Sequence, residues 1–524
     1  MRILCLSLSM VLLGCQPAVK EQPVTLSSPA WTDARAAQQG LAAGTFTSEQ
    51  LVQHYLEQIA AHNLQGHELR AIVDVNAEAL AQAKLLDEER AQGKMRSPLH
   101  GLPVVLKANI ATADQLPTTA GALALKDHLT AKDAELVKQL RAAGAVILAK
   151  SNLSEWANFR GEDSSSGWSA LGGQTRNPHV LTHTPCGSSS GSGVAVAADL
   201  SLLAVGTETD GSIMCPSSIN GIVGIKPTRG AVSGEGIIPI AAAQDIAGPM
   251  ARKVYDAALL LEAMLTTEAR QKLPASLTAA ALQPATGGKV LLVRAYDSRN
   301  PALPAILDKT AAVLTAAGIE VVTTDQWQLP GELYQAELAV LVYEFSRDLQ
   351  QWLTDYNVPA AVNTVQKIVD FNNAQGETAL AFYGQEYLEQ AAATDLTAQA
   401  EAYQQALTRS RELAEAALNT YLNDGYSAII MPSYGPAWPI DHVNGDNFNF
   451  GTSTAAAVAG YPSITLPGGY DGVLPLGLSV VGLPWSEPEL LRVAALLEQQ
   501  LSAYRRPGFV ASLPSNAEPA VKSE

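Results

Sequence analysis

Residues 185–193 read P-C-G-S-S-S-G-S-G and lead into a segment rich in alanine and valine that is predicted to be a helix. A second stretch at residues 206–213 reads G-T-E-T-D-G-S-I and lies between two apolar runs. Loops of this composition let backbone N–H groups converge on an anion, which acyl transfer requires beside its nucleophile. Either stretch alone is a weak signal, because glycine-serine stretches are usually only turns.

A lysine upstream gives the two loops a chemical meaning. Residues 101–107 read G-L-P-V-V-L-K, and the apolar run from Pro103 predicts a short buried strand that ends at Lys107. A serine hydroxyl is a poor nucleophile until a base takes its proton, and lysine is a base only when it is neutral. Burial disfavours the ammonium, and lowering the lysine pKa from ~10.4 to near 7 takes about 4–5 kcal/mol. Without the serine loops, a solvated lysine at a strand end would be the better interpretation.

These three segments together resemble the amidase signature family. Ser188 and Ser212 lie 24 positions apart, as in that family, and residues 224–228 read G-I-K-P-T just downstream. The resemblance runs from about residue 45 to residue 500. Within the family, the sequence is most similar to bacterial peptide amidases, in four segments: residues 152–161, 173–178, 207–213 and 435–441.

The resemblance implies a role for each residue. Ser212 is the expected nucleophile, Lys107 the base, and Ser188, after a cis Gly187–Ser188 peptide, the proton bridge between them. The N–H groups expected to form the oxyanion hole are those of Thr209, Asp210, Gly211 and Ser212. The expected reaction is hydrolysis of the C-terminal amide of peptides with release of ammonia, without metal or cofactor. The side chains expected to pair with the peptide are Asn109, Asn158 and Gln174.

Two positions depart from the family pattern. Ala108 follows the lysine where the family usually has aspartate, which places the local support of Lys107 in question. Asp210 replaces a glycine, and its carboxylate would repel an oxyanion. The Asp210 side chain is therefore expected to point away from the oxyanion.

The alternation of strand and helix signals predicts an α/β fold: one domain with a large, twisted, mixed sheet covered by helices on both faces. Residues 331–424 are helical in pattern almost throughout, and we interpret them as an insertion or cap that closes one side of the cleft. Strand signals return after this block, so the chain is predicted to be one amidase domain over residues 31–512. Residues 513–524 form a polar tail.

The N-terminus is predicted to carry a targeting signal. A short apolar run leads to L-L-G-C at residues 12–15, which resembles the lipobox of bacterial lipoproteins. The interpretation is a cleaved signal peptide at residues 1–14, lipidation of Cys15, and a flexible tether at residues 15–30. An ordinary secretory signal is the alternative. The protein is then expected to be lipid-anchored at the membrane in the periplasm, with the outer membrane favoured by Gln16 after the cysteine.

Net charge and composition limit the kinds of molecule that the protein is expected to bind. The net charge of −17 disfavours nucleic acid as a partner. The resemblance implies a small-molecule or peptide amide as the substrate, and the protein is expected to be a monomer or homodimer. Cys186 and Cys215 are predicted to be free, small apolar residues. His179 and His183 have helical spacing but lie beside prolines, and they are predicted to be surface histidines rather than metal ligands.

Several alternatives stay open. Residues 187–191 also fit G-x-S-x-G, an α/β-hydrolase elbow with Ser189 as nucleophile, and Asp441 and His442 would then complete the triad. Within the amidase resemblance, the chain is either a peptide amidase, a broad aliphatic or aryl amidase, or the glutaminase subunit of an amidotransferase. A lipoprotein that kept the fold without catalysis is the non-enzymatic alternative.

Overall fold

A computed structural model describes residues 32–273 and 275–513. The predicted signal peptide, the tether with Cys15 and residues 514–524 lie outside the described residues. The strands are β1 (Ile72–Val75), β2 (Pro103–Lys107), β3 (Val146–Ser151), β4 (Trp168–Ser169), β5 (Gly173–Gln174), β6 (Leu203–Glu208), β7 (Val223–Lys226), β8 (Ile246–Ala251), β9 (Lys289–Val293), β10 (Glu320–Thr324), β11 (Ala428–Pro432), β12 (Ser463–Asp471) and β13 (Leu474–Val481).

The α-helices alternate with these strands over most of the chain. They are α1 (Ala34–Ala42), α2 (Ser48–His62), α3 (Ala79–Ala91), α4 (Glu135–Ala142), α5 (Ser190–Ala197), α6 (Met214–Ile219), α7 (Val254–Met264), α8 (Thr267–Lys272), α9 (Leu277–Ala280), α10 (Leu303–Ala316), α11 (Gly331–Asp355), α12 (Val365–Gln375), α13 (Glu386–Ala393), α14 (Ala400–Leu422), α15 (Thr454–Ala459) and α16 (Glu487–Leu501).

Eleven strands form one mixed sheet in the order β1-β3-β2-β6-β8-β7-β12-β13-β11-β9-β10. Strands β3, β2 and β6 are parallel neighbours, and so are β11, β9 and β10. The strands between these two groups pair antiparallel. This confirms the predicted α/β class and the mixed sheet.

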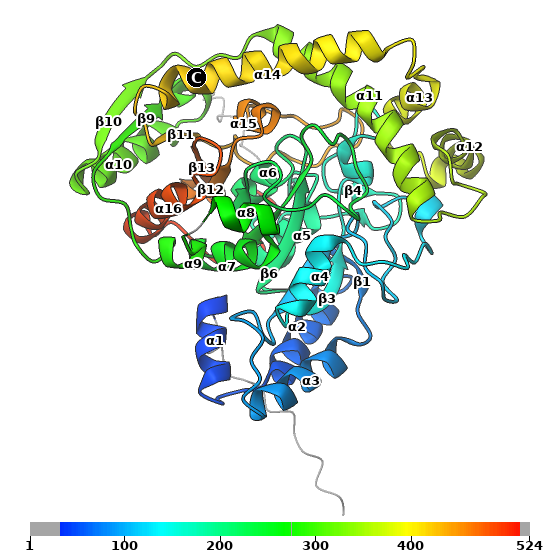
Figure 1. Ribbon diagram of the computed structural model, residues 1–524, viewed down its shortest axis with the longest axis horizontal. Helices are drawn as coiled ribbons and strands as arrows, with labels where there is room; N and C mark the ends of the chain where they lie inside the picture. Colours follow the sequence, from blue (N-terminus) through cyan, green and yellow to red (C-terminus); the bar gives the residue numbers. More distant parts are fainter. Residues whose placement is uncertain (1–31, 274, 514–524) are drawn as a thin grey trace, which may run out of the picture.

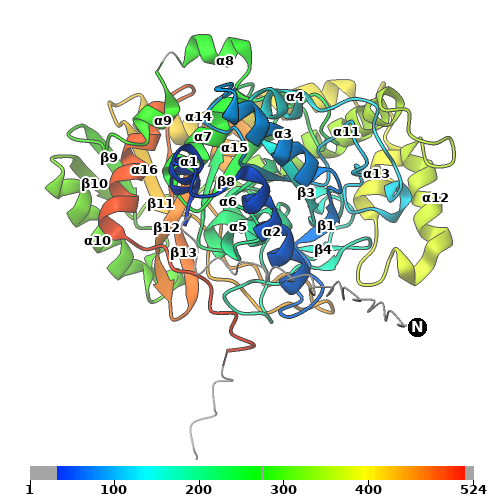
Figure 2. The ribbon, with the colours of Figure 1, turned by 90° about the horizontal axis from the view of Figure 1, so that it is seen from below.

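Helices cover the sheet on both faces, which explains why the central strands are continuously apolar. Every residue of β2, β3, β6 and β13 is buried. Helices α7, α9, α10 and α16 pack together, and α7 contacts β6, β7 and β8. Helices α5 and α6 also pack together, and α5 contacts β2, β3, β6 and β8. Figure 1 shows the N-terminal helices α1 to α3 in blue on the side of the molecule opposite to α11 and α14, and Figure 2 views that N-terminal side directly.

The segment 331–424 is helical, as predicted, and consists of α11, α12, α13 and α14 joined by short connections. The long helix α11 buries Phe345, Leu349 and Trp352 in a cluster that also contains Trp156 and Phe159. Both of these belong to the stretch around the short 3₁₀ segment Glu155–Asn158, whose C-terminal side borders the candidate site. The helical segment therefore packs directly against one wall of that site. Among the helices of the described part of the chain, none is long and apolar enough to cross a bilayer.

Candidate active site

Lys107 is the last residue of β2, in the interior of the sheet, and its side chain is completely buried. Its Nζ lies 2.7 Å from Ser188 Oγ, 2.9 Å from Thr207 Oγ1 and 3.1 Å from the Thr207 carbonyl oxygen. Strands β2 and β6 are parallel neighbours, which brings Lys107 beside Thr207 although 100 positions separate them. Lys107 is thus joined to Ser188 as the sequence predicted.

Burial lowers the pKa of Lys107 from its usual value to about 7, and the Asp245 and Glu208 carboxylates act in the opposite direction. The ammonium loses its hydration when it is enclosed by strands, and this cost exceeds the attraction of the two carboxylates. A substantial share of the lysine is therefore neutral at neutral pH, which a base requires.

Ser188 lies in the loop before α5, and the Gly187–Ser188 peptide is cis. The Ser188 carbonyl accepts a 3.1 Å hydrogen bond from the Ser154 N–H, and the next N–H, that of Ser189, donates to the Ser212 carbonyl at 3.1 Å. These bonds fix the loop beside the second serine stretch. Within the described residues, no hydrogen bond joins the Ser188 and Ser212 hydroxyls.

Ser212 follows β6 and immediately precedes the first turn of α6. Glu208 organises this turn, because its buried carboxylate accepts hydrogen bonds from the N–H groups of Ile213 at 2.7 Å and Met214 at 2.9 Å. Gly211 has a φ of +79°, and a Cβ there would lie 2.1 Å from the Tyr434 hydroxyl. Only glycine fits this position, for both its backbone conformation and its contact with Tyr434.

The four N–H groups predicted to bind an oxyanion are available. In the part of the chain that the structure covers, the N–H groups of residues 209–212 donate to no protein acceptor. Thr209, Asp210, Gly211 and Ser212 all line the same cavity. Unpaired backbone donors that face a cavity are suited to stabilise developing negative charge.

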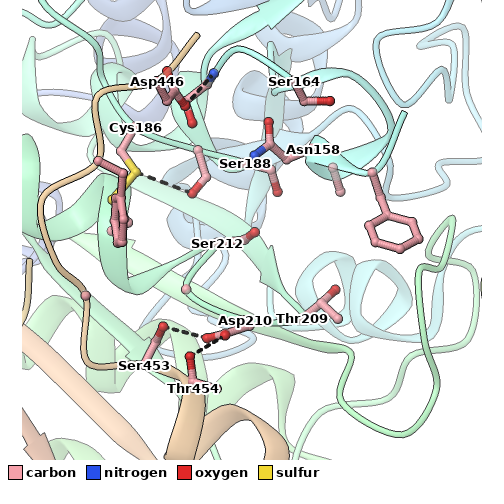
Figure 3. Close-up of a pocket in the computed structure, with 18 of the residues that line it drawn as sticks. Asn158, Ser164, Cys186, Ser188, Thr209, Asp210, Ser212, Asp446, Ser453 and Thr454 are labelled. Carbon is pink, nitrogen blue, oxygen red and sulfur yellow. Dashed lines mark hydrogen bonds between the residues drawn. A yellow bond between two sulfur atoms is a disulfide. The ribbon is translucent and has the colours of Figure 1, made fainter. Parts of the chain in front are cut away.

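The Asp210 side chain points away from these N–H groups, as predicted. Its carboxylate accepts hydrogen bonds from Ser453 Oγ at 2.5 Å and Thr454 Oγ1 at 2.7 Å, at the beginning of α15. Figure 3 shows both bonds on the side of the pocket below Ser212. Burial raises the pKa of Asp210, while the two hydroxyl donors oppose this shift.

Ala108 has no side chain that could support Lys107, so neighbouring groups provide the hydrogen bonds around the lysine. The Ala108 N–H donates to the Ser151 carbonyl, and its carbonyl accepts from the N–H groups of Thr119 and Ala120. The neighbouring Asn109 donates through Nδ2 to Thr207 Oγ1 at 3.0 Å, so it supports the threonine that contacts Lys107. Asn109 and Gln174 do not line the cavity, contrary to the expectation that they would pair with a peptide, whereas Asn158 does.

The cavity around the two serines has a volume of about 500 Å³. In Figure 3, Ser188 and Ser212 lie between Asp446 on one side and Asp210 on the other. Tyr334 and Leu341 of α11 close one wall. Another wall is formed by residues after β11, among them Tyr434, Trp438, Phe448 and Ser453. The described lining includes the carboxylates of Asp210 and Asp446 and no Lys, Arg or His.

Two further predictions, about side chains other than the three predicted catalytic residues, were wrong. Cys186 and Cys215 are not free but form a disulfide, because the two serine loops fold against each other and bring their Cα atoms to 5.9 Å. His179 and His183 are not on the surface: they are only 3% and 7% exposed. His179 Nε2 lies 3.1 Å from the Asn220 carbonyl, and burial lowers the pKa of His179 to about 4.

The α/β-hydrolase alternative does not fit this geometry. Ser189 is completely buried, and its hydroxyl donates to the Thr207 carbonyl at 3.0 Å rather than facing the cavity. His442 stacks on Phe382, with ring centroids 3.9 Å apart.

Among residues 32–273 and 275–513, no group of three or more His, Cys, Asp or Glu side chains could hold a metal ion.

Sequence reasoning missed two polar residues that support the site. Thr207 receives both hydrogen bonds of Lys107 that do not go to Ser188, and Asp245 accepts a 2.5 Å hydrogen bond from Thr209 Oγ1. Burial raises the pKa of Asp245 to about 7. Thr207 lies within the second glycine-rich stretch and could have been found there, whereas nothing near Asp245 in the sequence links it to the serines.

The parallel strands β2 and β6 present a buried lysine to two serine loops. This arrangement is typical of enzymes that hydrolyse amides, and comparison with known proteins identifies the same class. The family model described as Amidase matches residues 50–491, and the chain belongs to this family. It is 36% identical to a probable amidase of Arabidopsis thaliana over 486 residues, covering 89% of each chain.

A solved structure and a further sequence relative point to the same family. The native peptide amidase from Stenotrophomonas maltophilia is 44% identical, with a TM-score of 0.85. The match covers 92% of this chain and 99% of the other. A glutamyl-tRNA(Gln) amidotransferase component from Symbiobacterium thermophilum is 31% identical over 447 residues, covering 81% of this chain and 88% of the relative. The protein is therefore an amidase, a hydrolase of amide bonds.

Proposed function

We propose that Ser212, Ser188 and Lys107 form a catalytic triad that hydrolyses the C-terminal amide of peptides and releases ammonia. The observation that carries this proposal is the bond between Lys107 Nζ and Ser188 Oγ in a loop whose next N–H holds the Ser212 carbonyl. A neutral amine has two hydrogens and one lone pair. The two hydrogens can go to the two Thr207 oxygens, which leaves the lone pair facing the Ser188 hydroxyl.

The reaction follows from this arrangement. Lys107 takes the Ser188 proton while Ser188 takes the Ser212 proton, and Ser212 Oγ attacks the amide carbonyl carbon. The free N–H groups of residues 209–212 stabilise the oxyanion. The proton then returns from Lys107 through Ser188 to the leaving nitrogen, the C–N bond breaks, and ammonia leaves. Water, activated by the same relay, attacks the acyl-enzyme and regenerates Ser212.

A peptide acyl group suits the walls of the cavity. Polar groups of Asn158, Ser164 and Ser166 line it beside Tyr434 and Trp438, so peptide N–H and C=O groups find partners next to apolar surfaces. The wall formed by Tyr334 and Leu341 of α11 closes one side of the cavity. A primary amide needs only a small leaving-group pocket, whereas an internal peptide bond needs a cleft open on both sides of Ser212. The likeness to a peptide amidase at 44% identity supports the same substrate.

The cavity charge argues against the glutaminase alternative. Glutamine carries an α-carboxylate, and the described lining offers carboxylates from Asp210 and Asp446 but no cationic side chain. Two carboxylates beside an anionic substrate are repulsive, and more so in a partly desolvated cavity.

The test compares kcat/KM of the purified protein for a dipeptide amide, the same dipeptide extended by one residue, a fatty amide, an aryl amide and glutamine. The dipeptide amide should be hydrolysed best, and mass spectrometry should find the internal bond of the extended peptide intact. If the fatty or aryl amide is preferred by tenfold, about 1.4 kcal/mol of transition-state binding, the protein is a broad amidase instead.

A further inference from the structure

The disulfide joins the two serine loops at the candidate active site. Cys186 lies two positions before Ser188, and Cys215 lies three positions after Ser212. Both cysteines line the same cavity as the two serines. Figure 3 shows the Cys186 side chain next to Ser188, with the sulfur–sulfur bond on this side of the pocket. The bridge therefore connects the two loops on which the proposed chemistry depends.

Beyond the end of β6, two hydrogen bonds accompany the bridge. The Ser189 N–H donates to the Ser212 carbonyl at 3.1 Å, and Asn220 Nδ2, at the end of α6, donates to the Pro185 carbonyl at 2.9 Å. The bridge lies just before Ser188 and the Ser189 bond just after it, so these two bracket the pair of hydroxyls. Because the structure shows no hydrogen bond between the Ser188 and Ser212 hydroxyls themselves, their separation is determined by the loop backbones.

We propose that the Cys186–Cys215 bridge is a positioning element that holds Ser188 within proton-transfer reach of Ser212. This inference rests on the proposed triad. Opening the bridge leaves these segments joined, past the end of β6, by the Ser189–Ser212 and Asn220–Pro185 hydrogen bonds, with no covalent link beside the two hydroxyls. Displacement of reacting groups by about 1 Å can cost about a hundredfold in rate.

The surrounding structure indicates that the fold itself survives without the bridge. Helix α5 is buried along its whole length against β6, β8, β2 and β3, and α6 packs against β7, β12 and β13. Glu208 independently caps the first turn of α6 through the Ile213 and Met214 N–H groups. Loss of the bridge should therefore affect the loops more than the elements that carry them.

The experiment reduces the folded full-length protein with a water-soluble phosphine. The phosphine supplies two electrons and one water supplies two protons and an oxygen atom, so the bridge becomes two thiols and the phosphine becomes its oxide; intact mass confirms the change. We expect kcat for a dipeptide amide to fall at least about tenfold. The rate at which a fluorophosphonate labels Ser212 should fall in the same proportion, and reoxidation should restore both.

Serine variants test the same point without reductant. Cys186→Ser, Cys215→Ser and the double variant should show the same loss of kcat, because each removes the one link, and none should respond further to the phosphine. Ser217→Ala is the matched control: it is a buried change two positions after Cys215, outside the cavity lining, and should keep normal activity and phosphine sensitivity.

Three results would overturn the inference: unchanged kcat in the reduced protein, losses in the single variants that add in the double variant, or unfolding of the reduced protein below the assay temperature. The last result would assign the bridge to stability. An oxidised protein that hydrolyses no amide and takes up no fluorophosphonate would instead contradict the proposed triad, so the two failures are distinguishable.

Discussion

Thr207 accepts two hydrogen bonds from Lys107 Nζ, one through its carbonyl oxygen at 3.1 Å and one through its hydroxyl at 2.9 Å. The two bonds fix the direction of the amine, so that the lone pair of the neutral amine faces Ser188 Oγ. We predict that Thr207→Val, which keeps the shape but removes the hydroxyl, lowers kcat by about tenfold to a hundredfold, as loss of an orienting group does. Thr207→Ser keeps the hydroxyl and should retain most activity. Equal activity of the two variants would show that the hydroxyl has no orienting role.

The proposed triad predicts large, non-additive losses. Ser212→Ala should abolish amide hydrolysis, and Lys107→Ala and Ser188→Ala should each lower kcat by roughly three orders of magnitude or more, because the three groups act as one proton-transfer unit. His442→Ala, which changes a ring stacked on Phe382, should be nearly silent. Steady-state kinetics on a dipeptide amide, with melting curves to confirm folding, would measure this. Full activity of Lys107→Ala would contradict the assignment of the base.

The lowered pKa of Lys107 predicts the pH dependence of catalysis. Since burial brings this pKa to about 7 and only the neutral amine accepts a proton, kcat/KM should rise with pH and reach half of its plateau near pH 7. The rate of fluorophosphonate labelling should follow the same curve, because it requires the same activated serine. Melting temperatures over the same pH range separate this effect from unfolding. A rate that is flat between about pH 5.5 and 8.5 would exclude a lysine with this pKa.

The carboxylate of Asp446 predicts a preference for the charge of the substrate. Its oxygens accept hydrogen bonds from the Ser166 N–H at 3.0 Å and Trp438 Nε1 at 3.1 Å, at the cavity wall. Among dipeptide amides that end in arginine, leucine or glutamate, we expect the glutamate amide to be the poorest substrate by at least about tenfold in kcat/KM, or about 1.4 kcal/mol. Asp446→Asn should reduce this difference.

Asp441→Asn provides the control for that series. Asp441 lies in the same loop and accepts hydrogen bonds from the N–H groups of Val443 and Asn444, but it does not line the cavity. Its replacement removes the same charge without changing the cavity wall. If both variants shift the preference equally, the effect comes from net charge rather than from the site.

Lipidation of Cys15 is a proposal that rests on the sequence alone, since residues 1–31 lie outside the described part of the chain. A multiply acylated cysteine binds membranes firmly, whereas one acyl chain binds only marginally. Cell fractionation should find the protein with membranes, and Cys15→Ser should release it or leave an uncleaved precursor. Mass spectrometry that finds an unmodified N-terminus at another residue would contradict this proposal.

The sequence predicted those parts of the fold that have strong local patterns. The buried strand that ends at Lys107 and the helical segment 331–424 both form as expected. Strand β8 was not expected, because Gly248 and Pro249 interrupt its pattern, although its pairing with β6 and β7 tolerates both. Edge strand β10 has no fully buried residue and therefore gave little apolar signal.

The site was predictable to the extent that its chemistry lies in short motifs. Lys107, Ser188 and the 209–212 loop stand in recognisable stretches, and the structure brings them together. The Cys186–Cys215 bridge and Asp245 were beyond reach, because both depend on contacts between segments that are distant along the chain. Spacing alone does not reveal that two serine loops face each other closely enough to join their cysteines.

Helix α11 contributes Tyr334 and Leu341 to the cavity, but it belongs to a helical segment that leaves the sheet after β10 and returns to it at β11. Lys107, Ser188 and Ser212 all precede this segment, and Gln244 links it to the Ser212 loop: Gln244 Nε2 donates to the Thr209 carbonyl at 3.2 Å and to Glu337 Oε1 of α11 at 2.8 Å. One wall of the cavity can therefore change with this segment, while the walls formed by Asn158 and by residues after β11 lie outside it. A chimera that carries the corresponding helical segment of another amidase would alter that wall alone, provided that it keeps a partner for Gln244.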